Sequence, residues 1–469
     1  MDKFDYSGNS QIMSENLLWL LLDTLKARRQ GLAAIERRQR IRLAEMITFA
    51  RAHSPYYREL YKDLPERVED TSLLPITSKK DLMAHLNDWA TDREVTIEKA
   101  RAFVDKPDLI GERFLDKYTV ATTSGTTGTR GIFLLDDRNI AVNNALTFAR
   151  MMSTWLNAGD VIRILKHGGR WAMVTATGGH FLSSVIAARV RQSSRWGAKA
   201  FQIFSVYTPI PELVAQLNSF QPTIILGYAS VVSLLADEQE AGRLHLNPVL
   251  VQPAGEGLPA GEYDRIAKAF NAKVREAYSA TECGFIAYSC KYGWLHVNAD
   301  WVVLEPVDAD YRPVPPGEQS HTVLISNLAN RVQPILRYDL GDSVLVRPDP
   351  CPCGNPLPTI RVQGRASDVL TFPTEDGKQI TIAPLVFSTM LDRITGIERF
   401  QIVQITPTNL RVRLHLEGGA DPDQVWQVVH SEIAHLLSEH KLDHVTIERG
   451  GESPEQSPGG KYREIIPLS

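Results

Sequence analysis

The chain has 469 residues, of which 43% are hydrophobic and 23% charged, and its formal net charge is −4. A chain of this length buries a large core and forms more than one domain. A slightly acidic chain without a block of lysine and arginine has no electrostatic footprint for nucleic acid. The most apolar early run, Leu17–Leu22, is far too short to cross a membrane. We therefore expect a globular protein that partners neither nucleic acid nor membrane.

The sequence also predicts a compartment. Leu17–Leu22 follows acidic residues and lacks a basic region and a cleavage site, so it does not read as a signal peptide. Four cysteines in a chain of this length make no disulfide framework. Both observations favour a reducing, cytoplasmic location.

Hydrophobic spacing predicts the order of elements. Residues from about 14 to 60 are predicted to be helical, because apolar positions recur at helical spacing until Pro55. From about 70 to 350, strand-like runs alternate with helical stretches, with strands expected at 224–226, 249–251 and 323–325 and helices at 211–220 and 260–270. This alternation is typical of an α/β fold with mostly parallel sheets.

The chain changes character after a cluster of proline and glycine at 348–354. Strands are predicted near 400–404 and 410–416, and a helix near 423–440. These elements predict a small α+β domain of about 100 residues at the C-terminus.

The segment 122–131, Thr-Thr-Ser-Gly-Thr-Thr-Gly-Thr-Arg-Gly, is the most informative stretch. Glycines let backbone N–H groups approach an anion closely, and hydroxyl side chains add rotatable donors, so such a loop can bind phosphates. It is not a Walker A loop, because no Gly-Lys-Ser/Thr follows at the required spacing. A glycine- and threonine-rich turn of a β-hairpin is the alternative.

This loop resembles the phosphate-binding motif of the adenylate-forming enzymes, the superfamily of acyl-CoA synthetases and adenylation domains. The resemblance implies that the loop binds the phosphates of ATP through Thr123, Ser124, Gly125, Thr126, Thr127 and Gly128.

A second segment, Tyr278-Ser279-Ala280-Thr281-Glu282, resembles the Tyr-Gly-x-Thr-Glu motif of the same enzymes. The resemblance implies that the ring of Tyr278 packs on adenine, that Thr281 contacts phosphate and that Glu282 helps to hold Mg²⁺. Ser279 is also expected to bind the nucleotide. An aromatic face suits a purine, and a carboxylate suits a hard cation that bridges phosphates. The alternative is a strand end with a capping Thr-Glu pair.

A third segment, 337–342, resembles the Tyr-Arg-Thr-Gly-Asp motif. The resemblance implies that Asp342 accepts hydrogen bonds from both ribose hydroxyls, as an ionised carboxylate can. An ordinary Gly-Asp turn is the alternative. A weaker match at 253–257 adds Gly255 and Glu256 to the residues that line the nucleotide.

Two further motifs lie towards the C-terminus. Gly364–Asp368 resembles the hinge segment Gly-Arg-x-Asp-Asp, which implies that Arg365 reaches the nucleotide, although Ser367 replaces the usual pivot aspartate. Gly459–Arg463 resembles a Gly-Lys-x-x-Arg segment, which implies that Lys461 swings onto the acyl carboxylate and the α-phosphate. A mobile ammonium stabilises charge that builds up in phosphoryl transfer. A flexible polar tail is the alternative.

Six motifs in the family's order make coincidence a poor explanation, and the resemblance is closest to the phenylacetate-CoA ligase-like branch. The phosphate loop starts near 122, without the long N-terminal part of fatty acyl-CoA synthetases, and 54–58, 295–297 and 351–354 also match that branch. The resemblance implies a large domain, residues 1–364, with mostly parallel sheets and flanking helices. A small mobile α+β domain, residues 365–469, would follow it.

The implied activity is the ATP- and Mg²⁺-dependent conversion of a carboxylic acid, expected to be aromatic, into an acyl-adenylate. Transfer to coenzyme A would then give a thioester. An amine or a carrier protein as the acceptor is the alternative, and a non-catalytic nucleotide-binding relic of the fold is a second one. The acid lies outside what the sequence identifies, although Tyr207, Tyr228 and His180 are pocket candidates. For His180, a histidine of a surface loop is the alternative. A homodimer is left open.

Four residues could hold a metal. Three thiols and an imidazole form a common tetrahedral zinc set, and Cys-Pro-Cys-Gly resembles a zinc knuckle. The set comprises Cys290, His296, Cys351 and Cys353, which predicts one structural Zn²⁺. Four unrelated reduced side chains are the alternative. Cys283, next to Glu282, is expected to serve packing.

Overall fold

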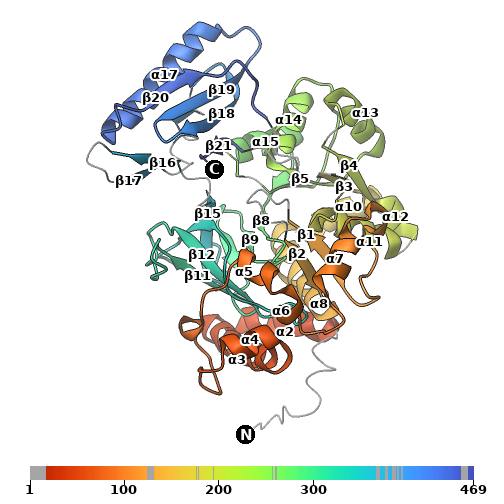
Figure 1. Cartoon of the computed structure of the whole chain (residues 1–469). Coiled ribbons are helices and arrows are strands. Elements are labelled where there is room, and N and C mark those ends of the chain that lie inside the picture. The colour runs from red at the N-terminus through yellow and green to blue at the C-terminus, as the bar shows by residue number, and fades with distance from the viewer. Residues whose placement is uncertain are drawn as a thin grey trace.

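The structure is a computed structural model. It describes residues 17–123, 131–175, 177, 179–193, 195–206, 208–255, 257–258, 261–365, 370–374, 379–382, 387, 390–391, 394–455 and 463–468. The N-terminal helices lie at one end of the molecule, the last strands and helix at the other, and the larger sheets between them (Figure 1).

The N-terminal region is helical and forms α2 (Leu17–Gln30), α3 (Leu32–His53) and α4 (Pro55–Leu60). The predicted break at Pro55 is confirmed: this proline opens α4, where its missing N–H costs nothing, and the Ser54 hydroxyl accepts from the N–H of Tyr57. A further break lies at Gly31, whose φ of 82° suits glycine and ends the first helix.

A short antiparallel hairpin follows a set of small helices. The helices are η1 (Thr71–Leu73), α5 (Lys79–Ala84), α6 (Leu86–Trp89), α7 (Ile97–Val104) and η2 (Pro107–Leu109). The hairpin strands are β1 (Thr119–Thr122) and β2 (Ile132–Leu135), and every residue of both is buried. The glycine- and threonine-rich segment therefore joins two strands that are fixed in the core.

A five-stranded parallel sheet follows the hairpin along the chain, with strand order β4-β3-β5-β6-β7. Its strands are β3 (Trp171–Thr175), β4 (Phe201–Ser205), β5 (Ile224–Tyr228), β6 (Leu250–Ala254) and β7 (Lys273–Val274). The helices before and between them are α8 (Asp137–Leu146), η3 (Thr147–Met152), α9 (Ser153–Trp155), α10 (Ala158–Lys166), α11 (Leu182–Ser193), α12 (Arg195–Ala200), α13 (Ile210–Phe220), α14 (Ala229–Glu240) and α15 (Glu262–Phe270). The expected α/β class is confirmed.

Apolar side chains from the helices cover this sheet. Leu217 of α13, Val232 of α14 and Ile266 of α15 belong to one buried cluster with Ile225 and Val251 of the strands. Strands that are covered in this way read as continuous apolar runs, which is why 224–226 and 249–251 stood out in the sequence. The carboxyl ends of parallel strands meet at one edge, where open α/β sheets bind their ligands.

Two antiparallel sheets come next along the chain. One has the order β14-β15-β10-β9-β8, and the other β11-β12-β13. Their strands are β8 (Ala277–Tyr278), β9 (Ala287–Ser289), β10 (Leu295–Val297), β11 (Val302–Val307), β12 (Thr322–Asn327), β13 (Ile335–Asp339), β14 (Asp342–Val346) and β15 (Thr359–Arg365). These strands carry three of the motif segments.

The C-terminal part has a core of its own. It contains the hairpin β16 (Leu370–Pro373) and β17 (Gln379–Ile382), and the sheet β20-β19-β18-β21 with α17 (Pro422–Glu439). The sheet strands are β18 (Ile397–Thr406), β19 (Asn409–Leu416), β20 (Thr446–Arg449) and β21 (Ile465–Ile466). Val429 and Ile433 of α17 share a buried cluster with Ile402 and Val412, and every member of this cluster lies between 370 and 465.

The two strands and the helix predicted for this region are thus confirmed in β18, β19 and α17. Across the part of the chain that the structure describes, no helix has both the length and the apolar character that a membrane crossing needs.

Candidate active site and metal centre

Two motifs that lie far apart in the sequence meet in the structure. Tyr278 ends β8 and Asp342 begins β14, and the Tyr278 hydroxyl donates a hydrogen bond of 2.7 Å to Asp342 Oδ2. Strands β8 and β14 are the two edges of one five-stranded sheet. Because neighbouring strands lie about 4.8 Å apart, such a bond between edge strands requires the sheet to curl on itself. The curled sheet encloses both side chains, which are each 9% exposed.

Glu282 and Tyr338 make the second link between the same two segments. The Tyr338 hydroxyl donates to Glu282 Oε1 over 3.0 Å, and both side chains are buried. The turn that carries Glu282 is closed by two backbone hydrogen bonds between Ala280 and Cys283, and Thr281 is half-buried within it. A buried carboxylate held by a tyrosine suits a cation that replaces the lost hydration. No pattern in the sequence pointed to this contact of Tyr338.

Burial raises the pKa of the Cys283 thiol to about 12. This side chain is therefore a neutral, buried thiol, in agreement with its expected packing role.

Hydrogen bonds hold together the two residues that flank the undescribed part of the predicted phosphate loop, Thr123 and Gly131. The Thr123 N–H donates to the carbonyl of Gly131 over 3.1 Å, and the Gly131 N–H donates to Thr123 Oγ1 over 2.9 Å. The Thr122 N–H donates to the carbonyl of His180 over 2.7 Å. The rest of the predicted phosphate site, Ser124, Gly125, Thr126, Thr127 and Gly128, lies outside the described residues.

Buried amides connect this hairpin to the site. Gln333 Oε1 accepts from the N–H of Leu134 in β2 over 2.7 Å, and Asn330 Nδ2 donates to the Leu134 carbonyl over 2.8 Å. Both amides lie just before β13, the strand that carries Tyr338. The hairpin and the Tyr338 strand are therefore held in one frame.

The other predicted nucleotide residues fall at strand ends. Gly255 directly follows β6, Ser279 follows β8 and is exposed, and Arg365 ends β15 with its backbone opposite Asp342. Nothing is described of the Arg365 side chain, and Glu256, Ser367 and Lys461 lie outside the described residues.

His180 is a buried residue, 1% exposed, and so it is no surface-loop histidine. Its Nε2 lies 3.1 Å from the carbonyl oxygen of Lys106, and its ring packs against Phe103 with centroids 5.5 Å apart. The imidazole therefore faces the segment after α7. Of the other pocket candidates, Tyr228 is buried at the end of β5, and Tyr207 lies outside the described residues.

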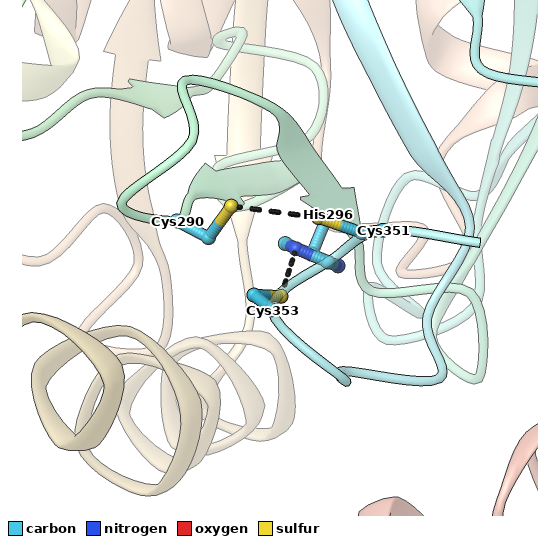
Figure 2. A group of neighbouring side chains, drawn as sticks. All are labelled: Cys290, His296, Cys351 and Cys353. Atoms are coloured by element: carbon cyan, nitrogen blue, oxygen red, sulfur yellow. Dashed lines mark hydrogen bonds between the residues drawn. The ribbon is translucent and has the colours of Figure 1, made fainter. Parts of the chain in front are cut away.

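The four predicted metal ligands come together (Figure 2). Their ligand atoms all lie within 4.8 Å of one another. The sulfur atoms of Cys290 and Cys351 are 3.7 Å apart, and Cys353 Sγ is 3.2 Å from His296 Nε2. Zinc–sulfur bonds of about 2.3 Å in a tetrahedron place two sulfurs about 3.8 Å apart, so the observed spacing fits this ion. All the cysteines are free thiols.

The imidazole of His296 is oriented for such a role. Its Nδ1 lies 3.3 Å from the carbonyl oxygen of Leu357. A carbonyl can only accept, so Nδ1 carries the proton and Nε2 is the nitrogen that can bind a metal. Burial raises the pKa of the Cys290 thiol, but the adjacent His296 imidazole and the N–H groups of Tyr292 and Trp294 outweigh the effect of burial, so the pKa falls below its ordinary value.

The ligands come from two segments. Cys290 follows β9 and His296 lies in β10, whereas Cys351 and Cys353 lie in the loop between β14 and β15. A metal bound here would fasten that loop to the sheet that carries Asp342.

Solved structures that are similar to this one include CoA ligases. A 2-hydroxyisobutyryl-CoA ligase in the postadenylation state, in complex with an acyl-AMP, matches with a TM-score of 0.62 and 20% identity, over 93% of this chain and 89% of that one. The same enzyme with its acyl-AMP and CoA, in the thioesterification state, matches with a TM-score of 0.52 and 21% identity, over 93% of this chain and 89% of that one. An anthranilate CoA ligase in complex with anthranoyl-AMP matches with a TM-score of 0.53 and 15% identity, over 73% and 64% of the two chains.

Comparison with the sequences of curated proteins matches a smaller part of the chain than the structural comparison does. Protein CapK of Staphylococcus aureus is 25% identical over 259 residues, and this match spans about half of each protein, 54% of the chain and 54% of the relative. No protein-family model matches the chain. At these identities the solved structures show the fold alone, which this chain shares with the CoA ligases named above.

Proposed function

We propose that the chain is an ATP-dependent carboxylate–CoA ligase that forms AMP. The observation that carries the proposal is the meeting of two distant motifs, in which Tyr278 holds Asp342 and Tyr338 holds Glu282. The site combines an aromatic side chain with two buried carboxylates, and the sequence adds a segment rich in glycine and threonine. These are the groups that a nucleotide with its magnesium ion requires.

The reaction has two steps. A carboxylate oxygen of the acid attacks the α-phosphorus of ATP, pyrophosphate leaves and the acyl-adenylate forms. The thiolate of CoA then attacks the acyl carbon, and AMP leaves. In this proposal Asp342 accepts from the ribose hydroxyls, Glu282 holds Mg²⁺, and Thr281 with the loop binds phosphates. Lys461 neutralises charge at the α-phosphate in the first step.

The division into residues 1–364 and 365–469, with rotation of the second part between the steps, belongs to the same proposal. The separate core of the C-terminal sheet supports it, because each part buries its own apolar side chains. The solved enzyme recorded in both a postadenylation and a thioesterification state supports rotation by analogy.

The acid is proposed to be aromatic, as in the phenylacetate-CoA ligase-like branch. A panel of aromatic and aliphatic acids in ATP–pyrophosphate exchange tests this, followed by mass spectrometry of reactions that contain free CoA. Exchange with an aromatic acid together with a CoA thioester is expected. Exchange without a thioester points to an amine or a carrier protein, and absence of exchange with every acid contradicts adenylation.

We further propose that Cys290, His296, Cys351 and Cys353 hold one Zn²⁺. The close approach of Cys290 to Cys351 and of Cys353 to His296, together with the fixed Nε2, supports a closed four-ligand site. With four protein ligands no position remains for a reacting water, so the ion is assigned a structural role.

Replacing Glu282 is expected to weaken the use of magnesium. Glu282→Gln keeps an oxygen that can accept from Tyr338 but removes the charge, so adenylation should slow roughly 10- to 100-fold and need more Mg²⁺. Exchange rates measured across a magnesium titration test this.

Glu276→Gln is the matched control, because the Glu276 carboxylate also accepts a hydrogen bond from a tyrosine, Tyr263. Glu276 is partly buried and directly precedes β8, the strand that Glu282 follows. Its rate and magnesium dependence should stay at the wild-type values. Equal losses in both variants would contradict the role of Glu282.

A further inference from the structure

Asp339 is a carboxylate that the motifs leave without a role, and three donors surround it. Its Oδ1 accepts from Thr322 Oγ1 over 2.6 Å and from the Gly341 N–H over 3.0 Å, and its Oδ2 accepts from the Tyr311 hydroxyl over 2.9 Å. Gly341 N–H also lies 3.1 Å from Thr322 Oγ1. The carboxylate therefore binds side chains from two other segments and the backbone of its own turn.

That turn is the two-residue link Leu340–Gly341 between β13 and β14, and Asp342 follows it directly. The Leu340 N–H donates to the carbonyl of Val323 over 3.1 Å, and Gly341 has φ of 78°, which a residue with a side chain rarely adopts. The Gly341 N–H is the turn's contact with Asp339. Because the planar peptide unit of Leu340 and Gly341 carries this N–H, the contact fixes the part of the turn from which Asp342 follows.

Tyr311 reaches Asp339 from a tight hairpin after β11. Asp308 Oδ1 accepts from the N–H groups of Asp310 and Arg312, and this closes the hairpin. Tyr311 has φ of 61°, an unfavourable conformation for a bulky residue, yet the residue is 40% exposed and contributes little to the core. The hydrogen bond to Asp339 raises the pKa of Tyr311. A strained, exposed tyrosine aimed at a carboxylate indicates a function for the contact.

We propose that Asp339, together with Tyr311 and Thr322, is a positioning group that fixes Asp342 for the ribose hydroxyls of the nucleotide. The proposal rests on the proposed function, in which Asp342 binds ribose. In the Tyr-Arg-Thr-Gly-Asp motif that this segment resembles, the places of Asp339 and Leu340 are taken by Arg and Thr. The arrangement around Asp339 is therefore a feature of this chain and not of that motif.

Binding of ATP and of 2′,3′-dideoxy-ATP, measured by equilibrium dialysis of the full chain with Mg²⁺, tests the proposal. Wild type should prefer ATP. Asp339→Ala removes all three acceptor contacts and should weaken ATP binding about tenfold, while binding of the dideoxy nucleotide stays the same. Asp339→Asn keeps one acceptor oxygen and should restore part of the preference. A purely structural role would lower both affinities together.

Tyr311→Phe is the second variant, because Tyr311 is exposed and its loss should leave the fold intact even where Asp339→Ala does not fold. It should lower the preference for ATP about threefold. Asp310→Asn is its control: this exposed carboxylate lies in the same hairpin, paired with Arg312 at 3.0 Å, and its loss should leave the preference unchanged.

The two proposals fail in different ways. If wild type binds neither nucleotide, or binds both equally, the ribose role of Asp342 fails and the positioning role fails with it. If wild type prefers ATP but Tyr311→Phe and the Asp339 variants keep that preference, or lose both affinities equally, only the positioning role is overturned.

Discussion

Lys461→Ala is expected to slow acyl-adenylate formation about 10²- to 10³-fold. The lysine lies outside the described residues, and the expectation rests on the Gly459–Arg463 motif. Negative charge grows on the α-phosphate as the acid attacks and pyrophosphate leaves, and an ammonium placed there is worth about 3–4 kcal/mol. Acid-dependent ATP–pyrophosphate exchange measures this step.

The second half-reaction separates a catalytic role from a folding defect. Thioester formation from pre-made acyl-adenylate and CoA should change little in Lys461→Ala, because the charge is needed when the phosphoryl group is attacked. Lys99→Ala, which removes an exposed lysine of α7, should match wild type in both steps. Equal losses in both half-reactions of Lys461→Ala would contradict the assigned role.

Elements with a strong local pattern could be predicted from the sequence. The helix α17 could be predicted because apolar residues recur in it at helical spacing, which is a local signal. β5 and β6 were predicted because strands covered on both faces are continuously apolar. The order in which they pair is set by contacts between distant residues, and so the strand order β4-β3-β5-β6-β7 could not be read from any window of the sequence.

Some residues of the candidate site could likewise be predicted from the sequence, and others could not. The sequence was enough to find the four proposed zinc ligands, Cys290, His296, Cys351 and Cys353, because few kinds of side chain bind zinc. This chemistry limits the number of candidate ligands, although Cys290 and Cys351, whose sulfurs face each other, are 61 residues apart in the chain. Tyr338, Tyr311 and Asp339 could not, because tyrosines and aspartates are common and only the fold shows which ones meet.

The same holds for the buried pair Arg150–Asp300, with atoms 2.7 Å apart and both side chains fully buried. Two charges 150 positions apart carry no local signal of their pairing, although their burial makes the contact obligatory.

The double variant Cys351→Ser/Cys353→Ser is expected to lose zinc and much of its stability. Wild type should carry about one zinc per chain by elemental analysis, and the variant almost none. Metal binding at a closed site contributes directly to folding, so the free energy of unfolding should fall by several kcal/mol, which thermal denaturation detects. The loop between β14 and β15 would then lose its attachment to β10.

Cys283→Ser is the matched control, because Cys283 is a buried neutral thiol outside the four-residue cluster. It should keep its zinc. Wild-type protein that is fully folded and free of metal would contradict the zinc assignment. Whether stability or activity is lost first when zinc is removed tests the structural role. A closed site activates no water, so mild chelation should lower the melting temperature while the protein that remains folded continues to adenylate. If adenylation stops while the melting temperature holds, the ion takes part in the chemistry and the assignment as a structural zinc is wrong.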